Sequence, residues 1–192
     1  KLQDLLKDTE QYAESASPEY FGVTSTIYEA IGDVYQAMKN PQEAEKAYQE
    51  MVRKAVKLHE LNKEKYDFRV GTANYKLGLF YRGLIGCHTL IPKPRKLNES
   101  QQKVFEVTEK CFKNAIGYTM ANARKGSGTH VEFHTSCMEA LMILHSAVGK
   151  YDTAVLFGKD CVNLSKAVYD KADDQVRGFR LANQMTALAG VY

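Results

Sequence analysis

Residues 28–51 read YEAIGDVYQAMKNPQEAEKAYQEM, and this stretch decides the fold. Small, aromatic and aliphatic residues recur in it at helical intervals: Tyr28, Ile31, Gly32, Tyr35, Ala44, Tyr48 and Met51. Such intervals are typical of one face of an α-helix. Asn40-Pro41 separates the two halves and is typical of an N-cap followed by a first-turn proline. The stretch therefore predicts two helices joined by a short turn, with Gly32 allowing the second helix to approach closely.

The first half of this pattern recurs along the chain. It returns as Asn74-x-x-Leu77-Gly78-x-x-Tyr81 and as Met185-x-x-Leu188-Ala189-x-x-Tyr192, and Met142 takes the glycine position in a further copy. These positions are 32, 78, 142 and 189, so their spacings are 78 − 32 = 46, 142 − 78 = 64 and 189 − 142 = 47. A fixed period of this length is the signature of a repeat architecture.

The long middle spacing indicates an insertion. The second-helix pattern that follows Gly78 is Thr108-x-x-x-Phe112-x-x-Ala115, and it begins at 108 instead of 78 + 12 = 90. An insertion of 108 − 90 = 18 residues between the two helices explains this, because 64 − 18 = 46. One period of about 46 residues then accounts for the whole chain.

These motifs resemble the tetratricopeptide (TPR) repeat family. Gly149-Lys150-Tyr151-Asp152-Thr153-Ala154 is similar to the G-x-Y-x-x-A turn between the two helices of a TPR. The long period and the phrase Gln42-Glu43-Ala44-Glu45 resemble the variant found in kinesin light chains and related adaptors. The resemblance implies an all-α fold, a TPR-like helical-hairpin solenoid wound as a right-handed superhelix, with repeats of about 46 residues and no strands.

The period divides residues 1–192 into parts of a single solenoid segment. Subtracting 46 from Tyr48, Met51 and Val52 gives Leu2, Leu5 and Leu6, so residues 1–16 are expected to be the second helix of a preceding repeat. Repeat 1 is expected at 17–66, repeat 2 at 67–128 with its insertion at about 86–99, repeat 3 at 129–172, and the first helix of repeat 4 at 173–192. Ser17-Pro18 and Asp67 are expected to open first helices. Both ends look cut, so we expect a piece of a longer solenoid.

Composition narrows the class of protein. The chain is 44% hydrophobic and 26% charged, which is typical of a folded domain, and its net charge of +3 is too small to indicate nucleic-acid binding. No apolar run is long enough to predict a membrane span. Cys87, Cys111, Cys137 and Cys161 lie inside helical patterns, so we expect buried, reduced thiols and a cytoplasmic location.

One group of residues has metal-ligand character. His130, His134 and Cys137 are spaced four and three apart, which places them on one helix face. No fourth ligand follows from the spacing, so helix packing is the preferred interpretation, and a metal-binding regulatory or enzymatic domain is the alternative. No spacing pairs a nucleophile with a base, and Gly126-Ser127-Gly128 lacks the G-K-[ST] ending of a P-loop. We therefore expect no enzyme activity and no cofactor.

The resemblance also implies a partner-binding groove lined by the first helices. The expected lining residues are Glu29, Asp33 and Gln36 in repeat 1, Tyr75, Leu79 and Arg82 in repeat 2, and Glu139 and Ile143 in repeat 3. TPRs that hold chaperone C-terminal tails need Lys and Asn where this chain has Glu29 and Asp33. Two carboxylates repel an acidic tail, so we expect a different protein partner, with a basic residue near repeat 1.

The insertion supplies a second candidate surface. It contains Ile91-Pro92-Lys93-Pro94-Arg95-Lys96, whose prolines favour an extended segment. The cations Lys93, Arg95 and Lys96 are suited to contact an acidic partner surface. A solvated loop is the simpler interpretation.

Overall fold

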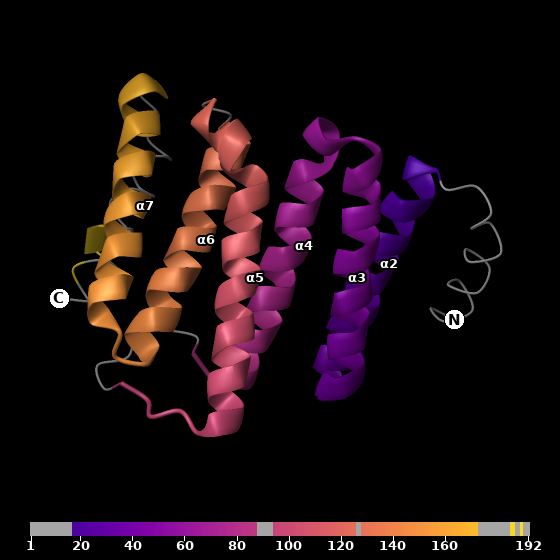
Figure 1. Ribbon diagram of the computed structural model, residues 1–192, viewed down its shortest axis with the longest axis horizontal. Coiled ribbons are helices and arrows are strands. Elements are labelled where there is room, and N and C mark those ends of the chain that lie inside the picture. The colour runs from indigo at the N-terminus through magenta and orange to yellow at the C-terminus, as the bar shows by residue number, and fades with distance from the viewer. Residues whose placement is uncertain (1–16, 88–93, 126–127, 173–184, 187–188, 190–192) are drawn as a thin grey trace. The chain divides into compact units, whose positions relative to one another are not determined.

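A computed structural model describes residues 17–87, 94–125, 128–172, 185–186 and 189. Across these ranges the secondary structure is helical, with six long helices and no strand, as the sequence predicts. The helices are α2 (Pro18–Ala37), α3 (Pro41–Leu61), α4 (Lys63–Leu84), α5 (Glu99–Arg124), α6 (Gly128–Ala147) and α7 (Tyr151–Ala172) (Figure 1). Helices that follow one another in sequence pack together, namely α2 with α3, α5 with α6, and α6 with α7.

The chain forms two compact units, residues 1–77 and 78–192, whose boundary lies within α4. The expected helix at 1–16, Lys93 of the insertion and most of the expected fourth repeat lie outside the described residues. No helix in the described ranges is long and apolar enough to cross a membrane.

Two predicted N-caps open the helices of the first unit. The Ser17 side chain accepts a hydrogen bond from the Tyr20 backbone N–H at 3.2 Å, and Pro18 occupies the first turn of α2. At the start of α3, Asn40 Oδ1 accepts from the Glu43 N–H at 3.4 Å. Both predictions are confirmed. Each cap accepts a hydrogen bond from a backbone amide that the helix itself leaves without a partner.

The expected start of α4 at Asp67 is wrong. The helix begins at Lys63, and Asn62 Oδ1 accepts a hydrogen bond from the Lys65 N–H at 3.1 Å. Asn62 therefore serves as the cap, and Asp67 lies buried one turn further along. Asn and Asp are both good capping residues, so the pattern of residue types did not separate the two positions.

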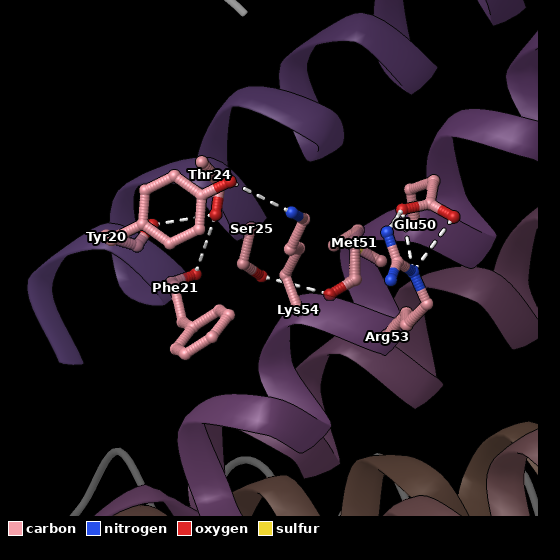
Figure 2. A network of polar contacts seen from close by, with 8 residues as sticks. All are labelled: Tyr20, Phe21, Thr24, Ser25, Glu50, Met51, Arg53 and Lys54. Carbon is pink, nitrogen blue, oxygen red and sulfur yellow. Dashed lines mark hydrogen bonds and ion pairs between the residues drawn. The ribbon is translucent and has the colours of Figure 1, made fainter. Parts of the chain in front are cut away.

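A glycine brings α2 and α3 together. A Cβ atom added to Gly32 would lie 2.6 Å from the ring of Tyr48, a residue with no exposed surface. Beside this contact, Ser25 Oγ donates to the Met51 carbonyl oxygen at 3.2 Å, and the buried Lys54 ammonium lies 3.2 Å from the Tyr20 hydroxyl (Figure 2). The close approach predicted for Gly32 is thus present in the structure.

The second unit has a contact of the same kind. A Cβ atom on Gly78, in the last part of α4, would lie 2.7 Å from the ring of Phe112 on α5, which is fully buried.

The start of α5 has a capping box, in which Asn98 and Gln101 each accept from the other's backbone N–H. Gly149 takes a φ of +77° in the turn between α6 and α7, a conformation that suits glycine.

Candidate partner-binding site

Helix α2 meets the first part of α4 through polar side chains. Arg69 donates a hydrogen bond to the Thr26 hydroxyl, and Lys76, two turns later on α4, reaches Asp33 and Glu29. Thr26, Glu29 and Asp33 lie on one side of α2, because their spacings of three and four residues match the helical repeat. Two of the helices expected to line the groove, α2 and the first part of α4, are therefore neighbours within the first unit.

Asp33 is held by two neighbours, Tyr48 and Lys76. The Tyr48 hydroxyl donates to Asp33 Oδ1 at 2.6 Å, and Lys76 Nζ lies 3.0 Å from the same oxygen. Gln36 Oε1 lies 2.8 Å from the phenol oxygen. Because a phenol has only one proton, the Gln36 amide fits better with its nitrogen turned toward Tyr48. Asp33 is therefore fixed in place, although its side chain is 48% exposed.

The surroundings of Tyr48 raise the pKa of its phenol. Burial is the main cause that raises the pKa of Tyr48 above its ordinary value, followed by its hydrogen bond to Asp33 and the negative charges of Asp33 and Glu29. The phenol thus stays protonated at neutral pH and acts as a hydrogen-bond donor. A buried tyrosine can use its polar end in this way only where an acceptor is in reach.

Glu29 is less well compensated than Asp33. Its Oε1 lies 3.7 Å from Lys76 Nζ, which is too long for a hydrogen bond, whereas Lys76 approaches both oxygens of Asp33 at 3.0 and 3.2 Å. We call Glu29, Asp33 and Lys76, with Tyr48 and Gln36, the acidic cluster. Two carboxylates and one ammonium give it a charge of 1 − 2 = −1. Of the two carboxylates, Glu29 therefore has the longer contact with the Lys76 ammonium.

The sequence pattern singled out Glu29, Asp33 and Gln36 but did not predict their contacts with Tyr48 and Lys76. Tyr48 was assigned to packing alone, although its hydroxyl was a signal that a polar partner would be near. For Lys76 the only signal was its spacing of seven residues from Arg69, which puts both cations on one side of α4.

Five further residues were predicted to line the groove, namely Tyr75, Leu79, Arg82, Glu139 and Ile143. Tyr75 is half-buried in the first unit. Leu79, Arg82, Glu139 and Ile143 are also half-buried, and all four belong to the second unit. The acidic cluster is thus the part of the predicted groove whose side chains are brought together within one unit.

The described end of the insertion is bound to the second unit. The Arg95 backbone N–H donates to the Ala147 carbonyl oxygen at 2.8 Å, and its guanidinium donates to the Ile85 carbonyl oxygen at 3.3 Å. A Cβ atom on Gly149 would lie 2.8 Å from Pro94. Arg95 therefore joins the carboxyl ends of α4 and α6, where a cation is favoured, while Lys96 is exposed.

The possible metal ligands on α6 are not gathered into a site. His134 and Cys137 are buried, with exposures of 4% and 0%, and His130 is half-buried. Burial raises the pKa of the Cys137 thiol to about 12, and burial followed by the charge of Arg124 lowers the pKa of His134. Within the described ranges, no three His, Cys, Asp or Glu side chains are grouped so that they could hold a metal ion.

A second polar group lies where α5, α6 and α7 meet, and His145 is its buried member. His145 Nε2 lies 3.4 Å from Glu109 Oε1, and Lys113 Nζ lies 2.5 Å from the same oxygen. The imidazole packs against Phe105 and Phe157 at ring-centroid distances of 5.4 and 5.5 Å. Burial is the main cause that lowers the pKa of His145, against the opposing charge of Glu109. The imidazole at 2% exposure is part of the packing of this unit.

No protein-family model, curated protein sequence or solved structure matches this chain.

Proposed function

We propose that the chain is a TPR-type scaffold or adaptor that binds a protein partner along the side of α2 and α4 that bears the acidic cluster. In this proposal the helical hairpins are the repeats of a right-handed solenoid, with a period of about 46 residues. Four free, buried cysteines are compatible with a reducing compartment, and we propose the cytoplasm.

The observation that carries the proposal is the residual charge of the cluster. Lys76 compensates one of the two carboxylates and leaves Glu29 with a contact of 3.7 Å and a side chain that is 36% exposed. An incoming lysine or arginine would complete the charge balance without burying either carboxylate. An acidic ligand would meet Glu29 first, which is why a chaperone C-terminal tail is a poor candidate.

We propose different roles for the cluster residues. Asp33 is held by Tyr48 and Lys76, so its main effect is to keep Lys76 in position. Glu29 offers the charge to the ligand. Exposed ion pairs contribute only about 0–1 kcal/mol each, so the affinity must also rest on apolar contacts. Tyr75 is the aromatic residue of the first unit that the motif places in the groove, and we propose it as this anchor.

An array of short synthetic peptides tests the proposal without a known partner. Peptides that pair a lysine or arginine with a large apolar residue should bind the full chain more strongly than peptides with glutamate in place of the cation. Binding should fall about 2–5-fold in Glu29→Gln, which corresponds to the loss of one exposed ion pair. Tyr75→Ala should weaken it further.

Glu43→Gln is the matched control. Glu43 is also a partly exposed carboxylate of the first unit, and it forms an ion pair with Lys46 at 2.6 Å on α3. Its removal changes the net charge by the same amount and should leave peptide binding unchanged. Equal losses in Glu43→Gln and Glu29→Gln, or an array without preference for cations, would rule out this site.

A further inference from the structure

His145 is a titratable residue in the last turn of α6 whose side chain is enclosed. Its imidazole packs against the rings of Phe105 on α5 and Phe157 on α7. Among the described residues, Nδ1 has no hydrogen-bond partner, and Nε2 approaches Glu109 Oε1 only to 3.4 Å, which is long for a hydrogen bond to a carboxylate. The site therefore suits an uncharged ring better than a charged one.

The charged groups around this imidazole include more cations than carboxylates. Glu109 and Lys113 face it from α5, and these two already form an ion pair at 2.5 Å. Lys150 faces it from the turn before α7, and α7 itself contributes the ring of Phe157. Burial lowers the pKa of His145, the charge of Glu109 raises it, and the charges of Lys150 and Lys113 lower it. A proton on the ring would thus add a third cation beside one carboxylate.

The backbone of His145 holds the turn between α6 and α7. Its carbonyl oxygen accepts hydrogen bonds from the N–H groups of Val148 and Lys150, at 3.2 and 3.0 Å. These bonds close the end of α6 and lead the chain through Gly149, whose φ is +77°. A displacement of His145 would therefore move this turn as well as the packing of the imidazole.

The turn in its place binds the residues that precede α5. We call residues 94–98 the docked segment, and Figure 1 shows that it extends from the start of α5 to the turn between α6 and α7. The Arg95 N–H donates to the Ala147 carbonyl oxygen at 2.8 Å, and Pro94 lies against Gly149. Because Arg95 already supplies the cation that the carboxyl end of α6 favours, the helix dipole gives little reason for a second one at His145.

We propose that His145 acts as a proton-sensitive latch that holds the docked segment at neutral pH and releases it in mild acid. The uncharged imidazole keeps the turn in shape. Below about pH 6.5, the ordinary pKa of histidine, the proton binds more readily to an open form in which the imidazole is in water. The closed form is therefore fully stable above this pH and loses stability as the pH falls below it. This inference does not depend on whether the acidic cluster binds a partner.

Hydrogen exchange of the full chain, followed by mass spectrometry and corrected for the intrinsic effect of pH, tests the latch. From about pH 7.5 to about pH 5.5, protection of the docked segment and of the α6–α7 turn should fall about tenfold. This is the change expected for an opening linked to one proton, one unit below the ordinary histidine pKa. Protection of α2 and α3 should stay unchanged. An equal fall in α2 and α3, or no fall in the docked segment, would overturn the proposal.

His145→Gln assigns the effect to this residue, because a glutamine side chain takes up no proton in this range. The acid-induced fall in protection should be absent in this variant. His134→Gln is the matched control, since His134 is also a buried histidine of α6, with an exposure of 4%. There the fall should remain. A fall that persists in His145→Gln, or one that disappears in His134→Gln, would contradict the latch.

Lys113→Gln provides a test that leaves the imidazole in place. The Lys113 side chain is 56% exposed, so its replacement should not disturb the packing. It frees Glu109 to pair with a protonated His145, so the fall in protection should shrink to about threefold. Lys110→Gln, at an exposed lysine of the same helix, is the control for net charge and should keep the tenfold fall. Equal falls in these two variants would show that the surrounding charges do not control the latch as proposed.

Discussion

The glycine contacts of the two units are alike in packing and different in polarity. Gly32 meets the ring of Tyr48 in the first unit, and Gly78 meets the ring of Phe112 in the second. Asp33 follows Gly32 by one residue and Gln36 follows it by four, and both contact the Tyr48 hydroxyl. At the same offsets from Gly78 stand Leu79 and Arg82, and Phe112 has no hydroxyl. The comparison teaches that the contact itself is structural, while the residues after the glycine decide whether the site is polar.

Helices α6 and α7 pack through a different pair of residues. Met142 on α6 and Ala154 on α7 form a buried cluster, and Val155 and Phe157 pack against it. A methionine at the glycine position of the pattern is thus found beside a small residue on the second helix.

The largest expected effect comes from filling the glycine contacts. Gly32→Ala and Gly78→Ala should each lower the free energy of unfolding by about 2–3 kcal/mol, because the new Cβ would overlap a ring that is fully enclosed. Denaturant unfolding measures this loss directly.

Gly117→Ala is the matched control on α5, since a Cβ there meets nothing within 4 Å. It should raise the free energy of unfolding by about 0.5–1 kcal/mol through helix propensity alone. Equal changes in the free energy of unfolding in the three variants would show that Gly32 and Gly78 are not needed for the close approach of the helices.

A smaller change in the free energy of unfolding should distinguish the Gly32–Tyr48 contact from the Gly78–Phe112 contact. Tyr48→Phe keeps the ring against Gly32 and removes only the hydroxyl, which should cost about 1–2 kcal/mol because the lost hydrogen bond ends on a carboxylate. In this variant a phenylalanine ring would face Gly32, as the Phe112 ring faces Gly78. Chemical denaturation at neutral pH checks this, and an unchanged free energy of unfolding would show that the hydroxyl adds nothing to the packing.

The same variant should also change the response to alkaline pH. The pKa of Tyr48 is raised in the folded chain, so its contribution to stability is fully present below the ordinary tyrosine pKa of about 10. That contribution is lost as the pH rises above this value. The fall in stability between about pH 9 and 11 should therefore be steeper in the natural chain than in Tyr48→Phe.

Much of the fold follows from local patterns. Ser17 and Asn40 mark their helix starts, and Gly32 marks a close approach, because each of these depends on residues near in sequence. The start of α4 was placed four residues late, since a cap is specified only weakly when Asn62 and Asp67 both qualify.

The side-chain contacts of the candidate site could be predicted only in part. Lys76 reaches Asp33 over 76 − 33 = 43 residues, and this depends on how two helices lie beside each other. Arg95 is exposed, as expected for a cation of the insertion, but its backbone and guanidinium also donate to the ends of two helices, which the sequence did not predict. Such long-range contacts leave no periodic signal in the sequence.

The central claim is that Glu29 carries the uncompensated charge and that Lys76 competes with a basic ligand for the cluster. Measuring the affinity of one basic–apolar peptide for Lys76→Gln tests this most directly, with Lys46→Gln as the control for net charge, since Lys46 pairs with Glu43 on α3. The account predicts that binding becomes about 2–5-fold tighter in Lys76→Gln and stays unchanged in Lys46→Gln. Weaker binding in Lys76→Gln, or equal effects of the two variants, would contradict it.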